Sequence, residues 1–331
     1  MNITALDLTK YFSLDQNVSR LERLPEIKSP IMDLVYPESK RTNYPRSIVA
    51  LKDLPKEVKN IPVIRRGTQA VPINDTKKAD GYEPFPIEAS MTLTAADLND
   101  LIAAGFTSNA QAEIDQKVDR LRKTTHATTE ALAAQSLTGK IQYPVRGALA
   151  DNSELYTADF GNTKTYTAAK AWDSAGVTLA DIIKDCLAMG DKANGNSFGN
   201  ALTVLVNSGV FNLVISLILK QSTSVLNLSV TDNAINFPGF TMRRLASTYY
   251  DYKTKQEISA IPSGKVCAIA TDAPHWLPYC AIDDIDAQLA PLPFFSKAVK
   301  IENPSAWELY GKTKPFPVPI VDAICWADVQ S

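Results

Sequence analysis

The segment from Ile61 to Leu137 constrains the fold of this chain most strongly, because it joins a long irregular stretch to a long amphipathic helix. The irregular stretch, residues 61–90, contains turn signals at Arg66-Gly67 and Asp80-Gly81 and several large apolar side chains. A loop of this length is uncommon inside a compact domain and usually has a function. Its apolar content argues against a solvated linker. The stretch therefore predicts an extended loop that lies on another surface, as in an assembly subunit.

Residues 108–138 are predicted to form one helix that ends before Gly139. Its apolar and threonine positions are spaced alternately four and three residues apart, which places them on one helical face; they are Ile114, Val118, Leu121, Thr125, Thr128 and Leu132. A helix of about 30 residues is about 45 Å long. This is well above the average length in globular proteins, so we expect the helix to act as a spine.

Composition excludes several classes of protein. The chain has 331 residues, of which 45% are hydrophobic and 21% charged, so it has enough apolar residues to bury a core. The net charge of −2 gives no general attraction to nucleic acid or to an anionic membrane. The longest apolar run, Val210–Leu219, is too short to span a bilayer. The four scattered cysteines lie in apolar surroundings and are predicted to be buried free thiols.

The remaining segments predict an α+β fold. Residues 1–60 contain several prolines that block long helices, so an extended arm is expected. Residues 143–177 favour a β-hairpin insertion, and a helix is expected from Thr178 to Gly190. Residues Ala201–Val206 form a short apolar run typical of a buried strand. The next helix, Gly209–Lys220, is apolar nearly all round and is expected to be central, and short strands follow it to the end of the chain.

No catalytic, metal or cofactor site is predicted. The two histidines, His126 and His275, have no partner at ligand spacing, so a position on a polar helix face is favoured for His126 and a packed loop for His275. The Gly311-Lys-Thr313 sequence lacks the first glycine of a phosphate-binding loop, and the following prolines exclude its helix. The acidic run at residues 283–286 lacks the glycine and final glutamate of a calcium loop, which favours a solvated turn.

Five segments, taken in order, resemble the lambda-type major capsid protein of tailed bacteriophages, the capsid protein E family. They are the run from Val63-Ile-Arg-Arg-Gly-Thr to Met91-Thr-Leu-Thr, the helix end Glu130–Lys140, the segment Thr178–Gly190 followed by Val204–Val214, the strand Phe237–Met242, and the C-terminal run Trp307–Val329. The resemblance covers most of residues 60–330. It implies the Hong Kong phage-type capsid fold, with these parts: N-terminal arm 1–60, extended loop 61–90, peripheral domain 91–142 with spine helix 108–138, hairpin insertion 143–177, mainly axial domain 178–295, and C-terminal strands 296–331 that return to both sheets.

The resemblance also implies a function. Such a protein assembles into pentamers and hexamers of an icosahedral head that encloses double-stranded DNA, without binding a specific sequence. The loop and arm would clasp neighbouring subunits, and the expected intersubunit contacts are Val63, Ile64, Arg65, Arg66, Val71, Ile73, Tyr82 and Phe85. The implied partners are other copies of the chain, a separate scaffolding protein, a portal and, as a further candidate, a decoration protein. The implied location is the virion, after assembly in the host cytoplasm, with no membrane contact.

Two alternatives remain open from the sequence. One is a small hydrolase-like enzyme that uses His275 with Asp272 and Cys280. The other is a different structural protein of the phage particle, such as a tail component. The absence of a nucleophile motif disfavours the first, and the long spine helix followed by an α+β half disfavours the second.

Overall fold

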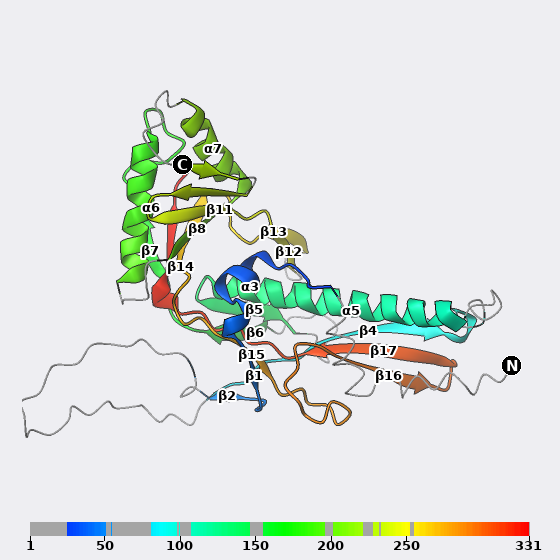
Figure 1. The fold of residues 1–331 in the computed structure, drawn as a ribbon. Coiled ribbons are helices and arrows are strands. Elements are labelled where there is room, and N and C mark those ends of the chain that lie inside the picture. Colours follow the sequence, from blue (N-terminus) through cyan, green and yellow to red (C-terminus); the bar gives the residue numbers. More distant parts are fainter. Residues whose placement is uncertain are drawn as a thin grey trace, which may run out of the picture.

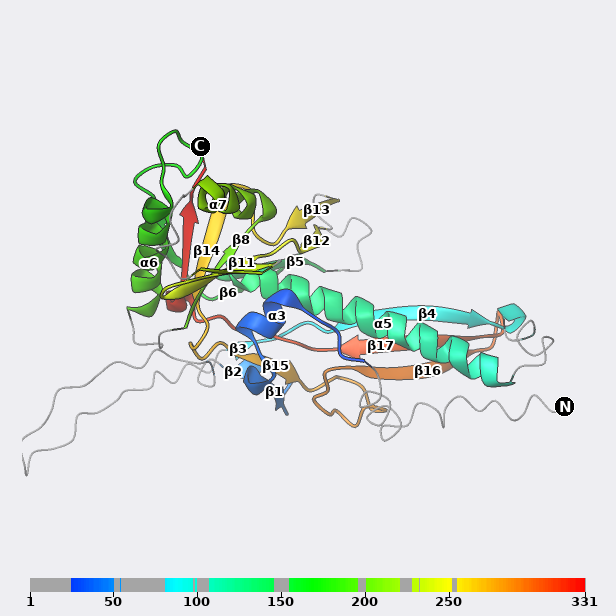
Figure 2. The same ribbon diagram turned by 45° about the horizontal axis from the view of Figure 1, so that its top comes forward.

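The computed structural model describes residues 25–50, 54, 81–97, 99, 107–145, 155–195, 201–220, 228–231, 233–251 and 255–330. Its described part has two regions (Figure 1). A long helix, α5 (Thr107–Ser136), lies along a three-stranded sheet. At one end of this helix a seven-stranded sheet with two helices, α6 (Leu179–Asn194) and α7 (Ser208–Lys220), rises to form the second region. Figure 2 shows the same division after rotation.

The structure confirms the long helix and most of its predicted face. Ile114, Val118, Leu121, Thr125 and Leu132 are buried, and Thr129 is the buried threonine in place of Thr128. Threonine is tolerated on this buried face because its hydroxyl donates a hydrogen bond to a backbone carbonyl one turn earlier in the helix. Thr125 donates to the carbonyl of Leu121 at 3.1 Å, and Thr129 donates to that of Thr125 at 3.0 Å.

The three-stranded sheet is antiparallel and supports the long helix. Its strand order is β16 (Phe295–Ile301), β17 (Ala306–Thr313) and β4 (Ile87–Thr94). Leu93 and Leu309 pack against the first turns of the buried helix face. Gly311 allows close approach at this layer, because an added Cβ would lie 2.9 Å from Leu121 Cβ. The core of this region is therefore a thin layer between one helix and one sheet.

The seven-stranded sheet is mixed. In order its strands are β7 (Lys164–Thr167), β18 (Ile324–Asp328), β14 (Lys265–Ala270), β8 (Leu202–Val206), β11 (Phe240–Arg244), β10 (Ala234–Phe237) and β9 (Ser229–Val230). The central β8 is parallel to β11 and antiparallel to β14. All five residues of β8 are buried, as the continuous apolar run predicted. The α+β prediction is thus confirmed.

The two helices of this region depart from the predictions in one respect each. The helix starts as predicted, with Thr178 at its N-cap in a capping box with Asp181, but α6 continues past Gly190 to Asn194. Inside the helix, Gly190 allows close packing against Leu202, because an added Cβ would lie 2.4 Å from a Leu202 methyl carbon. The prediction that α7 is central was wrong. Only Val210, Phe211 and Val214 are buried, and its outer half is partly exposed, with Leu219 80% exposed.

The predicted hairpin insertion at 143–177 also needs correction. The hairpin consists of β5 (Lys140–Pro144) and β6 (Leu155–Asp159), so it starts directly after α5 and ends at residue 159. The following strand β7 leaves the hairpin and pairs in parallel with β18. The turn-rich composition of the segment did not distinguish a local partner strand from a distant one.

Residues 25–50 are part of the folded body, so the prediction of an arm over 1–60 was wrong for them; residues 1–24 lie outside the described residues. The elements here are α3 (Pro30–Val35), the 3-10 turn η2 (Glu38–Lys40), β1 (Arg41–Tyr44) and β2 (Val49–Ala50). β1 pairs in parallel with β15 (Leu277–Cys280). Pro30 begins α3, at the one helix position where proline fits well. A further hairpin, β12 (Thr248–Asp251) with β13 (Gln256–Ser259), lies above α5 (Figure 1).

Candidate functional site

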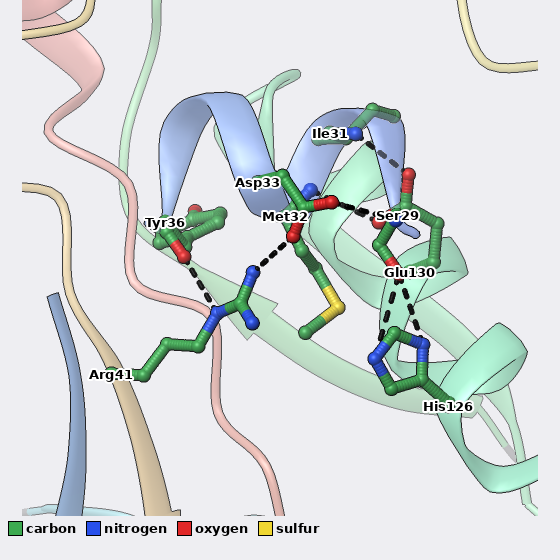
Figure 3. Close-up of polar contacts among 8 residues, drawn as sticks. All are labelled: Ser29, Ile31, Met32, Asp33, Tyr36, Arg41, His126 and Glu130. Atoms are coloured by element: carbon green, nitrogen blue, oxygen red, sulfur yellow. Dashed lines mark hydrogen bonds and ion pairs between the residues drawn. The ribbon is translucent and has the colours of Figure 1, made fainter. Parts of the chain in front are cut away.

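A polar junction fixes α3 to the long helix (Figure 3). The carboxylate of Glu130 on α5 accepts the backbone N–H of Ile31 at 2.7 Å and that of Met32 at 3.0 Å. These N–H groups belong to the first turn of α3, where no intrahelical acceptor exists. Ser29 is at the N-cap position but makes no side-chain capping bond. Glu130 therefore supplies from another helix the cap that α3 lacks locally.

The same junction includes an ion pair and a histidine. Asp33 accepts the backbone N–H of Ser29 at 2.8 Å and pairs with Arg41 at 2.7 Å, and Arg41 also donates to the carbonyl of Tyr36 at 2.7 Å. The Ser29 hydroxyl lies 3.0 Å from Nδ1 of His126 on α5. The predicted surface role of His126 is thus replaced by a half-buried contact with the N-terminal segment.

Burial dominates the electrostatics of this junction. It raises the pKa of Glu130, and the two backbone N–H bonds act in the opposite direction. Burial lowers the pKa of His126, and the nearby Arg41 guanidinium lowers it further. Both shifts make the charged form less favourable than it is in water, and for Glu130 the two backbone N–H bonds offset part of that cost.

The predicted intersubunit residues divide into two groups. Val63, Ile64, Arg65, Arg66, Val71 and Ile73 lie outside the described residues. Tyr82 lies in β3 (Gly81–Tyr82), which pairs with β2. Its ring packs 5.6 Å from that of Phe160 and 5.5 Å from that of Phe316, and its hydroxyl donates to the carbonyl of Asp159. These Tyr82 contacts are within one chain.

Phe85, the other described member of the predicted contact set, stays on the surface. Its ring lies 4.9 Å from that of Tyr156, and the side chain is 40% exposed. Of the two described residues, Phe85 is therefore the more accessible to a neighbouring subunit.

In the acidic run at residues 283–286, Asp283 and Asp286 are exposed to solvent, as predicted, but Asp284 is buried. Asp284, whose side chain is 4% exposed, pairs with Lys297 at 2.7 Å and with Lys312 at 2.9 Å. Asp283 pairs with Lys314 at 2.7 Å, and the Lys314 side chain is 1% exposed. These pairs tie the loop 281–294 to β16 and β17. Within the described residues no group of three His, Cys, Asp or Glu side chains is placed to hold a metal ion.

The geometry contradicts the hydrolase alternative. Nδ1 of the buried His275 accepts the N–H of Ile320 at 3.0 Å, and Nε2 donates to the carbonyl of Ala270 at 3.3 Å. Both ring nitrogens are therefore committed to the backbone, and no lone pair is available to a substrate. Burial raises the pKa of Cys280 to about 12, so this thiol stays protonated. As predicted, all four cysteines are buried and free.

Sequence reasoning missed the partners of Glu130 and Asp284. The partner of Glu130 is 99 residues away along the chain, and Asp284 binds lysines on two later strands. No local pattern indicates such contacts. The only available signal was a carboxylate close to the apolar face of the long helix.

Comparison with known proteins identifies the family. The sequence profile of the family described as Phage major capsid protein E matches residues 15–329. The chain belongs to this family. This phage major capsid protein is therefore a structural subunit of a phage head, and the resemblance found in the sequence is confirmed.

A solved structure supports the fold of this capsid protein. It matches the crystal structure of a protein assigned as the capsid protein of a prophage of E. coli CFT073, with 18% identity, a TM-score of 0.66, and coverage of 96% of this chain and 99% of that one. This likeness confirms the Hong Kong phage-type fold. An encapsulin complex from Synechococcus elongatus PCC 7942 is more distant, with 9% identity, 95% coverage of each chain and a TM-score of 0.49. No curated protein matches the sequence. Among the described residues, no helix is long and apolar enough to cross a membrane.

Proposed function

We propose that this capsid protein assembles into pentamers and hexamers of an icosahedral head that encloses double-stranded DNA, with residues 61–80 reaching onto a neighbouring copy. The observation that carries this proposal is the ladder between β2 and β3, which pairs Val49 with Tyr82 and Ala50 with Gly81. The ladder holds both ends of the segment 51–80 at one place on the body. A segment with Val63, Ile64, Val71 and Ile73 that leaves and returns at one point is suited to cover an adjacent surface.

The packing of Tyr82 refines this proposal. Because Tyr82 is held against Phe160 and Phe316 of its own chain, it serves as an anchor at the base of the loop. The intersubunit contact is then made by the residues from Val63 to Ile73, with Phe85 at the edge. Arg65 and Arg66 contribute less than the apolar residues, because ion pairs at a surface are weak.

The family membership supports the further partners. We propose a separate scaffolding protein, a portal and a decoration protein as partners, assembly in the host cytoplasm, and a structural role without catalysis. The net charge of −2 is compatible with holding DNA without many phosphate contacts. The region around α5 and the region around the seven-stranded sheet would be the peripheral and axial domains of the shell.

The test is to express the full chain and examine it by size-exclusion chromatography and negative-stain microscopy. The wild-type chain should form closed shells, pentamers or hexamers. A variant in which a short Gly-Ser linker replaces residues 61–78 keeps Gly81 and Tyr82, so it should remain folded with an unchanged melting temperature but form no shells. A matched variant with Ser at Val63, Ile64, Val71 and Ile73 should behave in the same way, whereas Ala at Arg65 and Arg66 should have a smaller effect.

Two results would contradict the proposal. If the linker variant forms shells as readily as the wild type, the loop does not make the intersubunit contact. If the wild-type chain remains a small oligomer at every concentration, it does not assemble by itself.

A further inference from the structure

Two large apolar side chains are exposed on the loop 281–294, which joins β15 to β16 and is drawn in orange below β15 in Figure 1. Ile285 is 89% exposed and Leu289 is 58% exposed. We call these two residues the apolar knob. Gln288 and Leu289 both have φ of 54°, a left-handed conformation that is uncommon for residues other than glycine. The backbone thus adopts an unfavourable conformation where it presents Leu289 to solvent.

The apolar knob does not result from a loosely held loop. The two ion pairs of Asp284 fix the loop to β16 and β17. The backbone N–H of Leu289 donates to the carbonyl of Asp284 at 3.2 Å, and Ala287 between them is fully buried. The loop is preorganised, so a partner that covers the knob pays little conformational entropy.

A groove beside the long helix has the size and the partly apolar lining needed to receive the apolar knob. It has a volume of about 280 Å³ and lies between α5, residues 27–31 and β12. Ala127, Ala131 and Ala134 line its α5 side, and Ile27 and Tyr249 flank them. A cavity of roughly 150 Å³ accommodates a six-carbon ring, so this groove has room for both side chains of the knob.

The charges around the two features are opposite. Asp286, next to Ile285, has a side chain that is 68% exposed. Lys28 and Lys123 line the groove, Lys28 is exposed, and the Lys123 side chain is 60% exposed. Asp286 also pairs with Lys297 at 3.1 Å, Lys123 pairs with Asp119 at 2.5 Å, and Glu130 lines the groove. The opposite charges of Asp286 and Lys28 therefore give the contact its orientation.

We propose that the apolar knob of one copy inserts into this groove of an adjacent copy, with Asp286 facing Lys28. β12, which borders the groove, and the loop 281–294 lie on opposite sides of α5 (Figures 1 and 2), so we assign the pairing to two copies of the chain. A contact between two different patches repeats head to tail and closes into a ring when the rotation permits. The inference rests on the proposed self-assembly and adds to it a second contact, separate from the loop 61–80.

A charge exchange tests the pairing. Asp286→Lys and Lys28→Glu should each raise the protein concentration needed for shell formation by roughly tenfold, because the affected contact repeats in every subunit. The combined variant should recover most of the loss, since the opposite charges are restored in reversed order. If neither single variant affects assembly, or if the combined variant is no better than the worse single one, the proposed pairing is wrong.

Engineered cysteines test the contact directly. Cysteine at Leu289 and Ala127 in one chain should give covalent dimers and higher oligomers when assembled shells are oxidised and run on a non-reducing gel. Each single variant should remain monomeric, because the four native cysteines are buried. Absence of covalent oligomers from the double variant would overturn the proposal.

Apolar variants separate this contact from shell formation in general. Ser at Ile285 and Leu289 should reduce shell yield without changing the melting temperature, whereas Val230→Ser, a similar change at an exposed position on β9, should have no effect. If the wild type assembles and the knob variant assembles equally well, only this inference fails. If the wild type forms no rings or shells, the proposed function fails and the inference fails with it.

Discussion

Glu130 accepts the backbone N–H of Ile31 at 2.7 Å, so a side chain of the long helix caps a helix that lies 99 residues earlier in the sequence. The second carboxylate oxygen accepts the N–H of Met32. These two bonds hold the N-terminal segment on α5. Removing the Glu130 carboxylate would leave the N–H groups of Ile31 and Met32 without acceptors. Residues 25–50, for which the proline content predicted an extended arm, are therefore part of the folded body of the capsid protein.

Replacing Glu130 with Ala should destabilise the protein by about 2 kcal/mol, because two charge-assisted capping bonds are lost in a half-buried place. The free energy of unfolding from urea titration measures this. Glu113→Ala is the matched control on the same helix, because Glu113 makes only a 3.5 Å surface pair with Lys117 and should cost about 0.5 kcal/mol or less. Equal losses of unfolding free energy for the two variants would show that the capping bonds contribute no more than a surface ion pair.

The pair of Lys314 and Asp283 should respond asymmetrically to mutation. Lys314 is 1% exposed, whereas the side chain of Asp283 is 60% exposed. Asp283→Ala leaves a buried ammonium group without its partner and should cost about 3 kcal/mol. Lys314→Met removes the buried charge and leaves only a solvated carboxylate, so it should cost less than about 1 kcal/mol. Chemical denaturation of both variants checks the order, and the reverse order would contradict it.

Gly311→Ala should separate the long helix from the sheet beneath it. The added Cβ would lie 2.9 Å from Leu121 Cβ and 2.9 Å from a ring carbon of Phe294. Overpacking of this kind costs about 1–3 kcal/mol, which a lower melting temperature would reveal. Gly195→Ala is the control, because its nearest neighbour would be 3.5 Å away. A Gly311→Ala variant as stable as the control would mean that this layer is not tightly packed.

Acid should destabilise the protein through His275. Burial lowers the pKa of His275 from its ordinary value of 6.5 to about 3. The unfolded state therefore binds more protons between these values, and stability falls as the pH decreases from about 6.5 towards about 3. The slope from this group is about 1.4 kcal/mol per pH unit.

The check is the free energy of unfolding measured between pH 7 and pH 4 for the wild type and for His275→Asn. The asparagine keeps an acceptor near the N–H of Ile320 but does not titrate. The variant should be less stable at pH 7, and its stability should depend less on pH. Parallel curves for the two proteins would show that His275 does not cause the acid sensitivity.

Local sequence patterns correctly predicted the elements that are specified by residues close together in the sequence. The spacing of Ile114, Val118 and Leu121 determined the buried face of α5, because helical periodicity places them on one side whatever they contact. The predicted start of α6 at Thr178 was also correct, and there Thr178 forms a capping box with the nearby Asp181. The order of weak motifs along residues 60–330 was enough to indicate the capsid family.

The partners of these elements were decided only by the tertiary structure. Whether Lys164–Thr167 pairs within a hairpin or with β18, whether residues 25–50 pack on α5, and whether α7 is central all depend on contacts distant in the sequence. The same holds for Glu130 and for the lysines bound by Asp284. Periodicity and capping boxes act within a few residues, whereas the cap that Glu130 supplies to α3 and the burial of Asp284 both depend on partners that only the folded chain brings near.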